Sequence, residues 1–152
     1  MDTQSMAREM LESLSQLVRG PIRDLRGLSG GEMGMLIYLE VQKGSAPTEL
    51  GRFFGISSAR VTNALNSLEK KGYVLRQPVP GDRRRVRVNV TEAGSARVRE
   101  HLNATLQDVI RLMDAMGEND AREFLRLTKR VVQLYNEGVV TGLPPAPAPD
   151  LG

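Results

Sequence analysis

Residues 57–90, SSARVTNALNSLEKKGYVLRQPVPGDRRRVRVNV, decide the fold of this chain. The first half of this stretch has the periodicity of a helix, and the second half has that of a strand returning from a turn. Gly55 is a typical residue to end a helix that begins near Pro47, and Ser57 is a typical N-cap for the next helix, expected over residues 58–70. Two helices joined by so short a turn predict a helix-turn-helix.

The helix expected over residues 58–70 has two different faces. Apolar residues recur on one side at i, i+3, i+4 and i+7, as a core-facing side requires; they are Val61, Ala64, Leu65 and Leu68. The opposite side is polar and carries Ala59, Asn63, Asn66 and Lys70, flanked by Arg60, Thr62 and Ser67. Asn can pair with both N6 and N7 of adenine, and Arg can reach guanine or phosphate, so this side suits a DNA major groove. Amphipathicity alone favours an ordinary solvated helix, and the charges that follow it favour DNA.

A basic β-hairpin follows this helix. A short strand is expected over residues 73–77, a turn over 78–82 (PVPGD), and a return strand that alternates between two sides. One side carries Val86, Val88 and Val90, and the other carries Arg85, Arg87 and Asn89. The tip reads GDRRR, and three adjacent arginines repel one another unless phosphates or a narrow minor groove neutralise them.

Positive charge is concentrated in this module. Residues 57–90 contain eight Lys or Arg against Glu69 and Asp82, a net charge of +6, whereas the whole chain carries +3 and its remainder therefore −3. Such a concentration on one module is typical of a surface that binds nucleic acid.

The run LEKKGYV, the tip GDRRR and the run VTEAG together resemble the MarR family of dimeric winged helix-turn-helix regulators. The resemblance covers residues 29–94 in motif. It implies that Asp82 fixes the wing by pairing with a neighbouring basic group and that Arg84 enters the minor groove. The sequence departs from the family at Asn63, where an arginine is frequent, and at Asn66 and Ser67, where an acidic residue and an arginine are frequent. The predicted DNA-contacting residues are Ser57, Ser58, Arg60, Thr62, Asn63, Asn66, Lys70, Arg83, Arg84, Arg85 and Arg87.

Composition excludes several classes of site. The chain has 152 residues, 40% of them hydrophobic, which is enough for one domain or for a small domain with a helical appendage. It has no cysteine, which excludes thiol redox sensing, disulfides and Cys-ligated zinc. A single His101 does not suffice for a multi-histidine metal site or a His-based catalytic centre within one chain. We therefore expect no metal, no cofactor and no enzymatic activity. Without a membrane-length apolar run or a signal-peptide pattern, we also expect a cytoplasmic protein without a membrane partner.

Further helices are expected before the helix-turn-helix. Residues 4–18 have an apolar stripe of Met6, Met10, Leu14 and Leu17, widened by Leu11 and Val18, and Gly20 and Pro21 end that helix. Ser29 and Glu32 have the spacing of a capping box, which predicts a helix to about Lys43 with Met33, Leu36, Ile37 and Val41 inward. Pro47 suits a first helical position, and Leu50, Phe53 and Phe54 form the core side of the short helix that follows.

Two long helices are expected after the hairpin. Thr91 caps a helix over residues 92–116, Gly117 breaks it, Asn119 or Asp120 caps the next, and that helix ends near Glu137. Their apolar sides consist of Val98, Leu102, Leu106, Val109, Ile110 and Met113, and of Phe124, Leu127, Val131, Leu134 and Tyr135. One small winged domain cannot cover these sides and that of the first helix, so we predict a homodimer.

The sequence thus predicts a mainly α, winged helix-turn-helix (α+β) fold in four parts. These are an N-terminal dimerisation helix with its connection (1–28), a DNA-binding lobe (29–91), C-terminal dimerisation helices (92–138) and a mobile Pro- and Ala-rich tail (139–152) that ends in LPPAPAPDLG. The family resemblance also implies a small-molecule effector pocket between the dimerisation helices and the DNA-binding lobe. Its candidate walls are Met10, Leu14, Met33, Ile37, Tyr38 and Leu102.

The leading hypothesis is a dimeric transcriptional repressor or activator that binds pseudo-palindromic double-stranded DNA, and of the two we favour a repressor. The alternative is a winged-helix module that docks on an acidic protein or that binds nucleic acid without sequence preference. An enzyme is the third, but no base, metal cluster or phosphate-binding loop accompanies a nucleophile.

Overall fold

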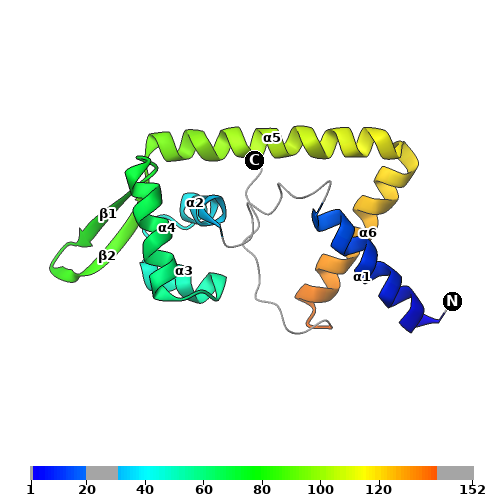
Figure 1. Ribbon diagram of the computed structural model, residues 1–152, viewed down its shortest axis with the longest axis horizontal. Helices are drawn as coiled ribbons and strands as arrows, with labels where there is room; N and C mark the ends of the chain where they lie inside the picture. The colour runs from blue at the N-terminus through cyan, green and yellow to red at the C-terminus, as the bar shows by residue number, and fades with distance from the viewer. Residues whose placement is uncertain (1, 20–30, 140–152) are drawn as a thin grey trace. The chain divides into compact units, whose positions relative to one another are not determined.

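A computed structural model describes residues 2–19 and 31–139, and within them it confirms the mainly α, winged helix-turn-helix fold. The elements follow one another as α1 (Thr3–Arg19), α2 (Glu32–Val41), α3 (Pro47–Phe54), α4 (Ser58–Lys70), β1 (Val74–Val79), β2 (Asp82–Val90), α5 (Glu92–Met116) and α6 (Glu118–Asn136) (Figure 1). The predicted connection over residues 20–28, Ser29 and the tail from residue 140 onward lie outside the described residues. In the described part of the chain, no helix is long and apolar enough to cross a membrane.

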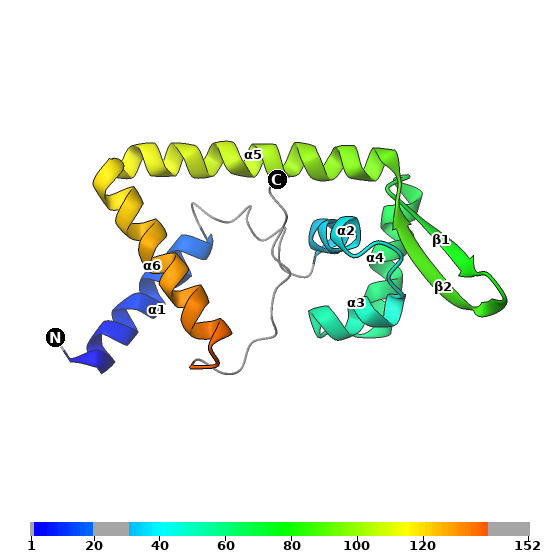
Figure 2. The same ribbon diagram turned by 180° about the vertical axis from the view of Figure 1, so that it is seen from behind.

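A single apolar core joins the helix-turn-helix to the hairpin. Val61, Leu65 and Leu68 of α4 are almost fully buried, as their spacing predicts, and they pack with Leu50 of α3 and Val88 of β2. Figures 1 and 2 show α2, α3 and α4 grouped beside the hairpin from two opposite sides. The core therefore fixes the exposed side of α4 relative to the wing.

The two helices of the helix-turn-helix begin and end at the residues that the sequence predicts. Gly55 is the C-cap of α3 at a left-handed φ of 62°, a conformation that glycine adopts without strain. Pro47 is the first residue of α3, as expected. Ser57 is the N-cap of α4, and its hydroxyl accepts a hydrogen bond from the backbone N–H of Arg60 at 3.3 Å.

The predictions for α2 are partly wrong. The helix begins at Glu32 with Gly31 as its N-cap, so Glu32 is the first helical residue rather than the third that a capping box requires. Leu36 and Ile37 are buried as expected, but Val41 is 41% exposed, and Met35 and Leu39 are buried although the predicted stripe omits them. The physical reason is that α2 is apolar nearly all round, so a one-sided stripe does not describe it.

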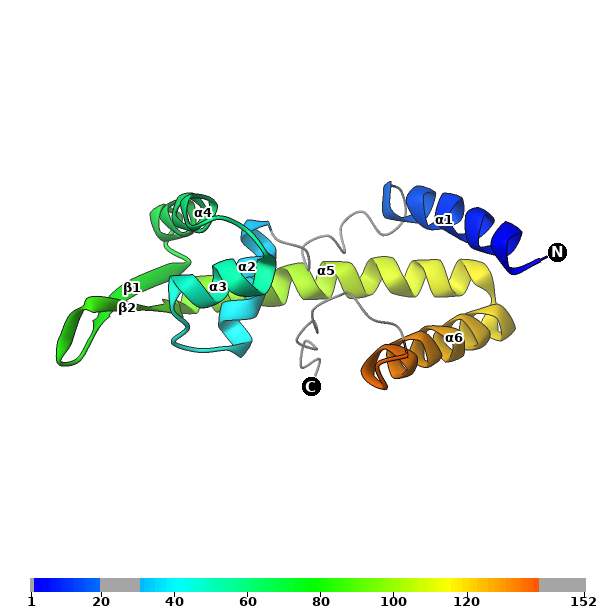
Figure 3. The ribbon, with the colours of Figure 1, turned by 90° about the horizontal axis from the view of Figure 1, so that it is seen from below.

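The hairpin has longer strands and a shorter turn than the sequence predicts: β1 begins at Val74 and continues to Val79, and β2 begins at Asp82, so the turn predicted over residues 78–82 is wrong at both ends. β1 and β2 pair antiparallel from Val74 opposite Val90 to Pro78 opposite Val86, and the register then shifts so that Val79 lies opposite Asp82. Val88 also bridges Ser45, which ties the hairpin to the loop before α3. As Figure 3 shows from below, the free end of the hairpin projects beyond α3 and α4.

The chain divides into two compact units, residues 1–102 and 103–152, and the boundary lies within α5. α5 spans residues 92–116 as predicted, and at its start the Thr91 hydroxyl accepts a hydrogen bond from the N–H of Gly94 at 3.1 Å. α6 begins after Gly117, which is itself the N-cap at a φ of 82°. The expected cap at Asn119 or Asp120 is therefore wrong, because the glycine that breaks α5 also starts α6.

Candidate nucleic-acid interface

The sequence-predicted DNA contacts lie on two neighbouring surfaces of one lobe. Seven come from the start and outward side of α4, and four come from β2. All eleven side chains are exposed: Ser57, Ser58, Arg60, Thr62, Asn63, Asn66, Lys70, Arg83, Arg84, Arg85 and Arg87. We call the first seven the α4 surface and the last four the wing surface.

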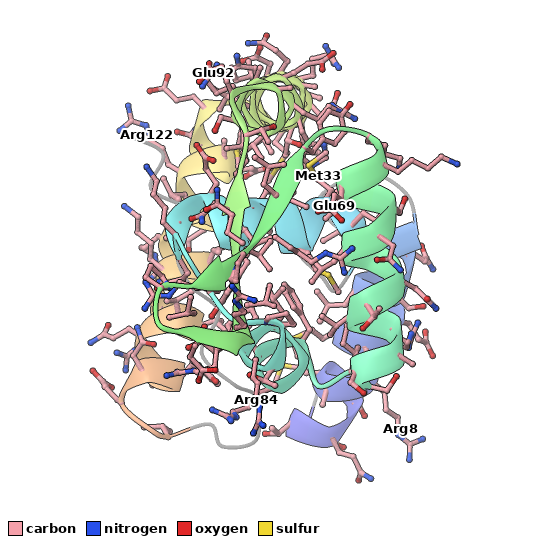
Figure 4. The ribbon with its side chains drawn as sticks, turned by 90° about the vertical axis from the view of Figure 1, so that its left-hand side faces the viewer. Arg8, Met33, Glu69, Arg84, Glu92 and Arg122 are labelled. Atoms are coloured by element: carbon pink, nitrogen blue, oxygen red, sulfur yellow. The ribbon has the colours of Figure 1, made fainter. Side chains whose placement is uncertain are left out.

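The wing tip is built by a tight turn and an irregular pairing. Gly81 has a φ of 85°, which favours glycine at the turn. The register shift between Pro78 and Val79 leaves Arg83, Arg84 and Arg85 outside the regular ladder, so their side chains are free to spread over a partner. Figure 4 shows Arg84 at the outer edge of the hairpin, pointing away from the core.

Asp82 organises this turn through the backbone. Its carboxylate accepts a hydrogen bond from the backbone N–H of Arg84 at 3.0 Å. The resemblance implied a basic group as its partner, whereas the recorded partner is an amide two residues along the chain. This short local bond shapes the backbone and leaves the Arg84 guanidinium exposed.

A network that sequence reasoning missed joins α4 to β1. The carboxylate of Glu69 accepts hydrogen bonds from Nε of Arg76 at 3.1 Å and from its terminal NH2 at 2.6 Å. The same NH2 group donates to Oδ1 of Asn66 at 2.6 Å. Figure 4 shows Glu69 between α4 and the hairpin. Opposite charges on the last turn of a helix and on the strand after it were the available signal, but only the fold sets their distance.

A second ion pair joins the end of α4 to the start of α2. Nζ of Lys71 lies 2.5 Å from the carboxylate of Glu32. This contact lowers the pKa of Glu32, chiefly through the hydrogen bond from Lys71 and then through one from Ser67. The pKa of Glu69 is likewise lowered, first by the hydrogen bond from the Arg76 side chain. Both carboxylates are therefore held ionised.

A groove of about 430 Å³ lies between the wing and the start of α3. Its walls combine three arginines, five small apolar residues and two other polar residues, Thr48 and Glu49: Gly44, Ala46, Pro47, Thr48, Glu49, Val79, Arg84, Arg85, Val86 and Arg87. Glu49 is already engaged, since its carboxylate accepts the backbone N–H of Ala46 at 2.8 Å.

The six residues predicted to line an effector pocket fall into two groups, four that pack in or against the core and two that are exposed on α1. Ile37 is buried in the core of the winged lobe, and Met33, Tyr38 and Leu102 pack against that core. The Tyr38 ring lies 4.6 Å from the Phe53 ring, centroid to centroid. Met10 and Leu14 are exposed on α1. Four of the six thus contribute to packing, and the groove described above has none of them in its walls.

Comparison with known proteins agrees with this geometry. The sequence pattern of the MarR family matches residues 26–85. The chain is 27% identical over 104 residues to the HTH-type transcriptional repressor YetL of Bacillus subtilis. The aligned region covers 67% of this chain and 62% of YetL. It is 26% identical over 141 residues to the transcriptional repressor MprA of Escherichia coli. This aligned region covers 89% of this chain and 77% of MprA.

A solved structure shares the fold over nearly the whole chain. The crystal structure of Streptococcus pneumoniae FabT in complex with DNA superposes with a TM-score of 0.62 at 22% identity, covering 90% of this chain and 99% of that chain. The chain spans less than two thirds of YetL, the first of the relatives named above. The architecture that carries the α4 and wing surfaces is thus shared with FabT.

Proposed function

We propose that this chain is a transcriptional repressor of the MarR family, whose model matches residues 26–85, and that it binds a specific double-stranded DNA operator as a homodimer. The α4 surface reads base edges in the major groove, and the wing surface enters the adjacent minor groove. Repression is the activity named for YetL and MprA, and the bound DNA of FabT supports the class of ligand.

The observation that carries this proposal is the charge of the two surfaces after internal pairing. Residues 57–90 have a net charge of +6, and their two acidic groups are both engaged within the lobe. Glu69 pairs with Arg76, and Asp82 accepts the backbone N–H of Arg84. Lys71 pairs with Glu32, so the exposed basic groups of this stretch that make no ion pair among the described residues are Arg60, Lys70 and the four wing arginines, which a phosphate backbone would neutralise.

Apolar side chains that a single chain leaves uncovered support the proposed dimer. α6 buries none of its described residues. Exposed apolar side chains occur along α1, the second half of α5 and α6: Met6, Met10, Leu11, Leu14, Leu106, Ile110, Phe124, Leu125, Leu127, Val131 and Val132. So many exposed apolar groups are unusual for a monomer, and a second copy that buries them gives a two-fold assembly with two α4 surfaces.

The decisive experiment is selection of bound duplexes from a random-sequence pool at several salt concentrations, followed by sequencing. We expect an enriched inverted repeat whose half-sites lie about one helical turn, roughly 34 Å, apart, because each α4 enters one major groove. Affinity is expected to fall steeply with salt as counterions are released. Steep salt dependence without an enriched sequence would instead indicate nonspecific nucleic-acid binding and would refute the proposed repressor function.

Two variants test the wing contact and the dimer separately. Arg84→Ala is expected to weaken operator binding with an unchanged melting temperature, because the wing tip supports no core; Arg99→Ala on α5 is the matched control, expected to bind as the parent does. Unchanged affinity in Arg84→Ala would contradict the wing contact.

Leu127→Glu is expected to convert a dimer of the 16.7 kDa chain into a monomer in sedimentation equilibrium. A parent protein that sediments as a monomer would overturn the dimer.

A further inference from the structure

We propose that Arg76 fixes the side-chain amide of Asn66 so that only its NH2 group faces DNA, and that Asn66 therefore contacts a hydrogen-bond acceptor there. This inference rests on the proposed DNA binding and deepens it, since it assigns one residue of the α4 surface a single type of partner. The sequence alone left Asn66 free to pair with adenine through both its groups.

The orientation of the amide follows from the chemistry of arginine. The terminal NH2 of Arg76 lies 2.6 Å from Oδ1 of Asn66. A guanidinium has donors and no acceptor, so the atom of the amide that faces it must be the oxygen. The NH2 group of Asn66 then points to the other side, away from Arg76.

Arg76 is itself held in place, which makes it a fixed point for Asn66. Its Nε and terminal NH2 both donate to Oε2 of Glu69, and its backbone N–H donates to Oε1 of the same carboxylate at 3.4 Å. Arg76 is also paired with Val88 in the hairpin. Glu69 and Asn66 are three residues apart on α4, so one guanidinium spans neighbouring positions of the helix. The network therefore couples the amide of Asn66 to the base of the wing.

Asn63 provides an internal contrast. It is exposed on the same side of α4, and among the described residues its side chain makes no hydrogen bond to another side chain or to the backbone. Its amide is free to turn both groups toward one base, as the bidentate contact with adenine N6 and N7 requires. Two asparagines one turn apart are thus prepared for different partners.

The partner of Asn66 follows from its donor. In the major groove, guanine offers O6 and N7 as acceptors, thymine offers O4 and adenine offers N7, whereas cytosine offers only its N4 amino donor. A fixed NH2 therefore disfavours cytosine and gives adenine no advantage over guanine. A phosphate oxygen is an acceptor of the same kind, and the outcome of the test separates it from a base edge.

The test is a set of operator selections with the parent protein, Asn66→Ala, Arg76→Lys and the double variant. Arg76→Lys keeps a cation for Glu69, but a single ammonium lacks the fork that spans Glu69 and Asn66. If the acceptor is on a base, Asn66→Ala is expected to lose discrimination against cytosine at one operator position by roughly two- to tenfold, the range of one hydrogen bond. Arg76→Lys is expected to gain adenine preference at that position, and the double variant to show no such gain.

If the acceptor is a phosphate, Asn66→Ala is expected to lose a similar factor on every sequence, with base preferences unchanged. Arg76→Lys then weakens binding in the parent and has no further effect in Asn66→Ala. Asn66→Asp, compared with Asn63→Asp for the same change in charge, adds an independent reading. At a base contact it is expected to shift preference toward cytosine, whose amino group donates to the new carboxylate; at a phosphate it weakens binding more than Asn63→Asp does.

Three results would overturn the inference while leaving the repressor in place. They are an adenine preference in the parent that Asn66→Ala removes, unchanged binding in Asn66→Ala, and an effect of Arg76→Lys that is equal with and without Asn66. A parent protein that enriches no sequence at all would instead refute the proposed function, and this inference with it.

Discussion

Gly94 is the position where one added methyl group tests the packing of the wing most directly. It is buried in the first turn of α5, close to the backbone of Tyr73 at the base of the hairpin. A Cβ at this position would overlap the Tyr73 carbonyl oxygen and would lie 2.6 Å from Cγ1 of Val90 and 3.0 Å from the Tyr73 carbonyl carbon. Because two of these three atoms are backbone, rotation of a side chain cannot relieve the overlap.

Gly94→Ala therefore sets two effects against each other. Alanine is better than glycine inside a helix by about 1 kcal/mol. Overpacking a tight contact costs about 1 to 3 kcal/mol and sometimes more, and here the Tyr73 carbonyl oxygen also accepts the backbone N–H of Thr91 at 3.0 Å. Weakening that hydrogen bond costs about a further 1 kcal/mol, which offsets the gain from the alanine, so we expect a net loss of about 1 to 3 kcal/mol.

The assay is equilibrium unfolding in urea together with thermal melting. For a chain of 152 residues, each kcal/mol corresponds to a melting-temperature change of roughly 2 to 4 °C. Gly31→Ala is the matched control, because among the described residues no atom other than those of its chain neighbours lies within 4 Å of an added Cβ, and it is expected to change the free energy of unfolding by less than about 1 kcal/mol. A Gly94→Ala protein as stable as the parent would refute the close approach of α5 to the hairpin.

Two further predictions concern the core and the ion pairs. Leu65→Ala is expected to destabilise the protein by about 2 to 5 kcal/mol in urea unfolding, since Leu65 is fully buried, whereas Leu75→Ala on the exposed side of β1 is expected to cost far less; equal losses would contradict the assigned core. Glu32 has a folded-state pKa below its ordinary 4.5, so its ion pair contributes stability that is present above pH 4.5 and is lost as pH falls through the lower, folded-state pKa. The stability difference between the parent and Glu32→Gln is therefore expected to shrink on acidification below pH 4.5, and a constant difference from pH 7 to pH 3 would contradict the contact with Lys71.

Local signals were sufficient to predict the helix-turn-helix and the wing. The positions of Val61, Leu65 and Leu68 define a buried side because a helix repeats every 3.6 residues, and burial follows from that period alone. Gly55 and Ser57 act through their own backbone and the next few residues, so their roles are also visible in the sequence. The contact roles given to the α4 and wing residues remain predictions, although the structure exposes all of those side chains.

Local signals failed where more than one choice satisfied them. α2 is apolar on most sides, so periodicity could not distinguish the buried Met35 and Leu39 from the exposed Val41. Which of these residues is covered depends on what packs on each side of the helix. Similarly, Gly117, Asn119 and Asp120 were all acceptable starts for α6, and the backbone conformation at Gly117 selected the first.

Pairing between distant residues was decided by the tertiary structure alone. Lys71 and Glu32 are 39 residues apart, and Arg76 reaches Asn66 across the turn between α4 and β1. The sequence determined that these residues are charged or polar and that Asn66 lies on the outward side of its helix. Which donor faces which acceptor depends on distances of a few ångströms between separate elements, and those distances exist only after the shared core has packed α2, α4 and the hairpin together.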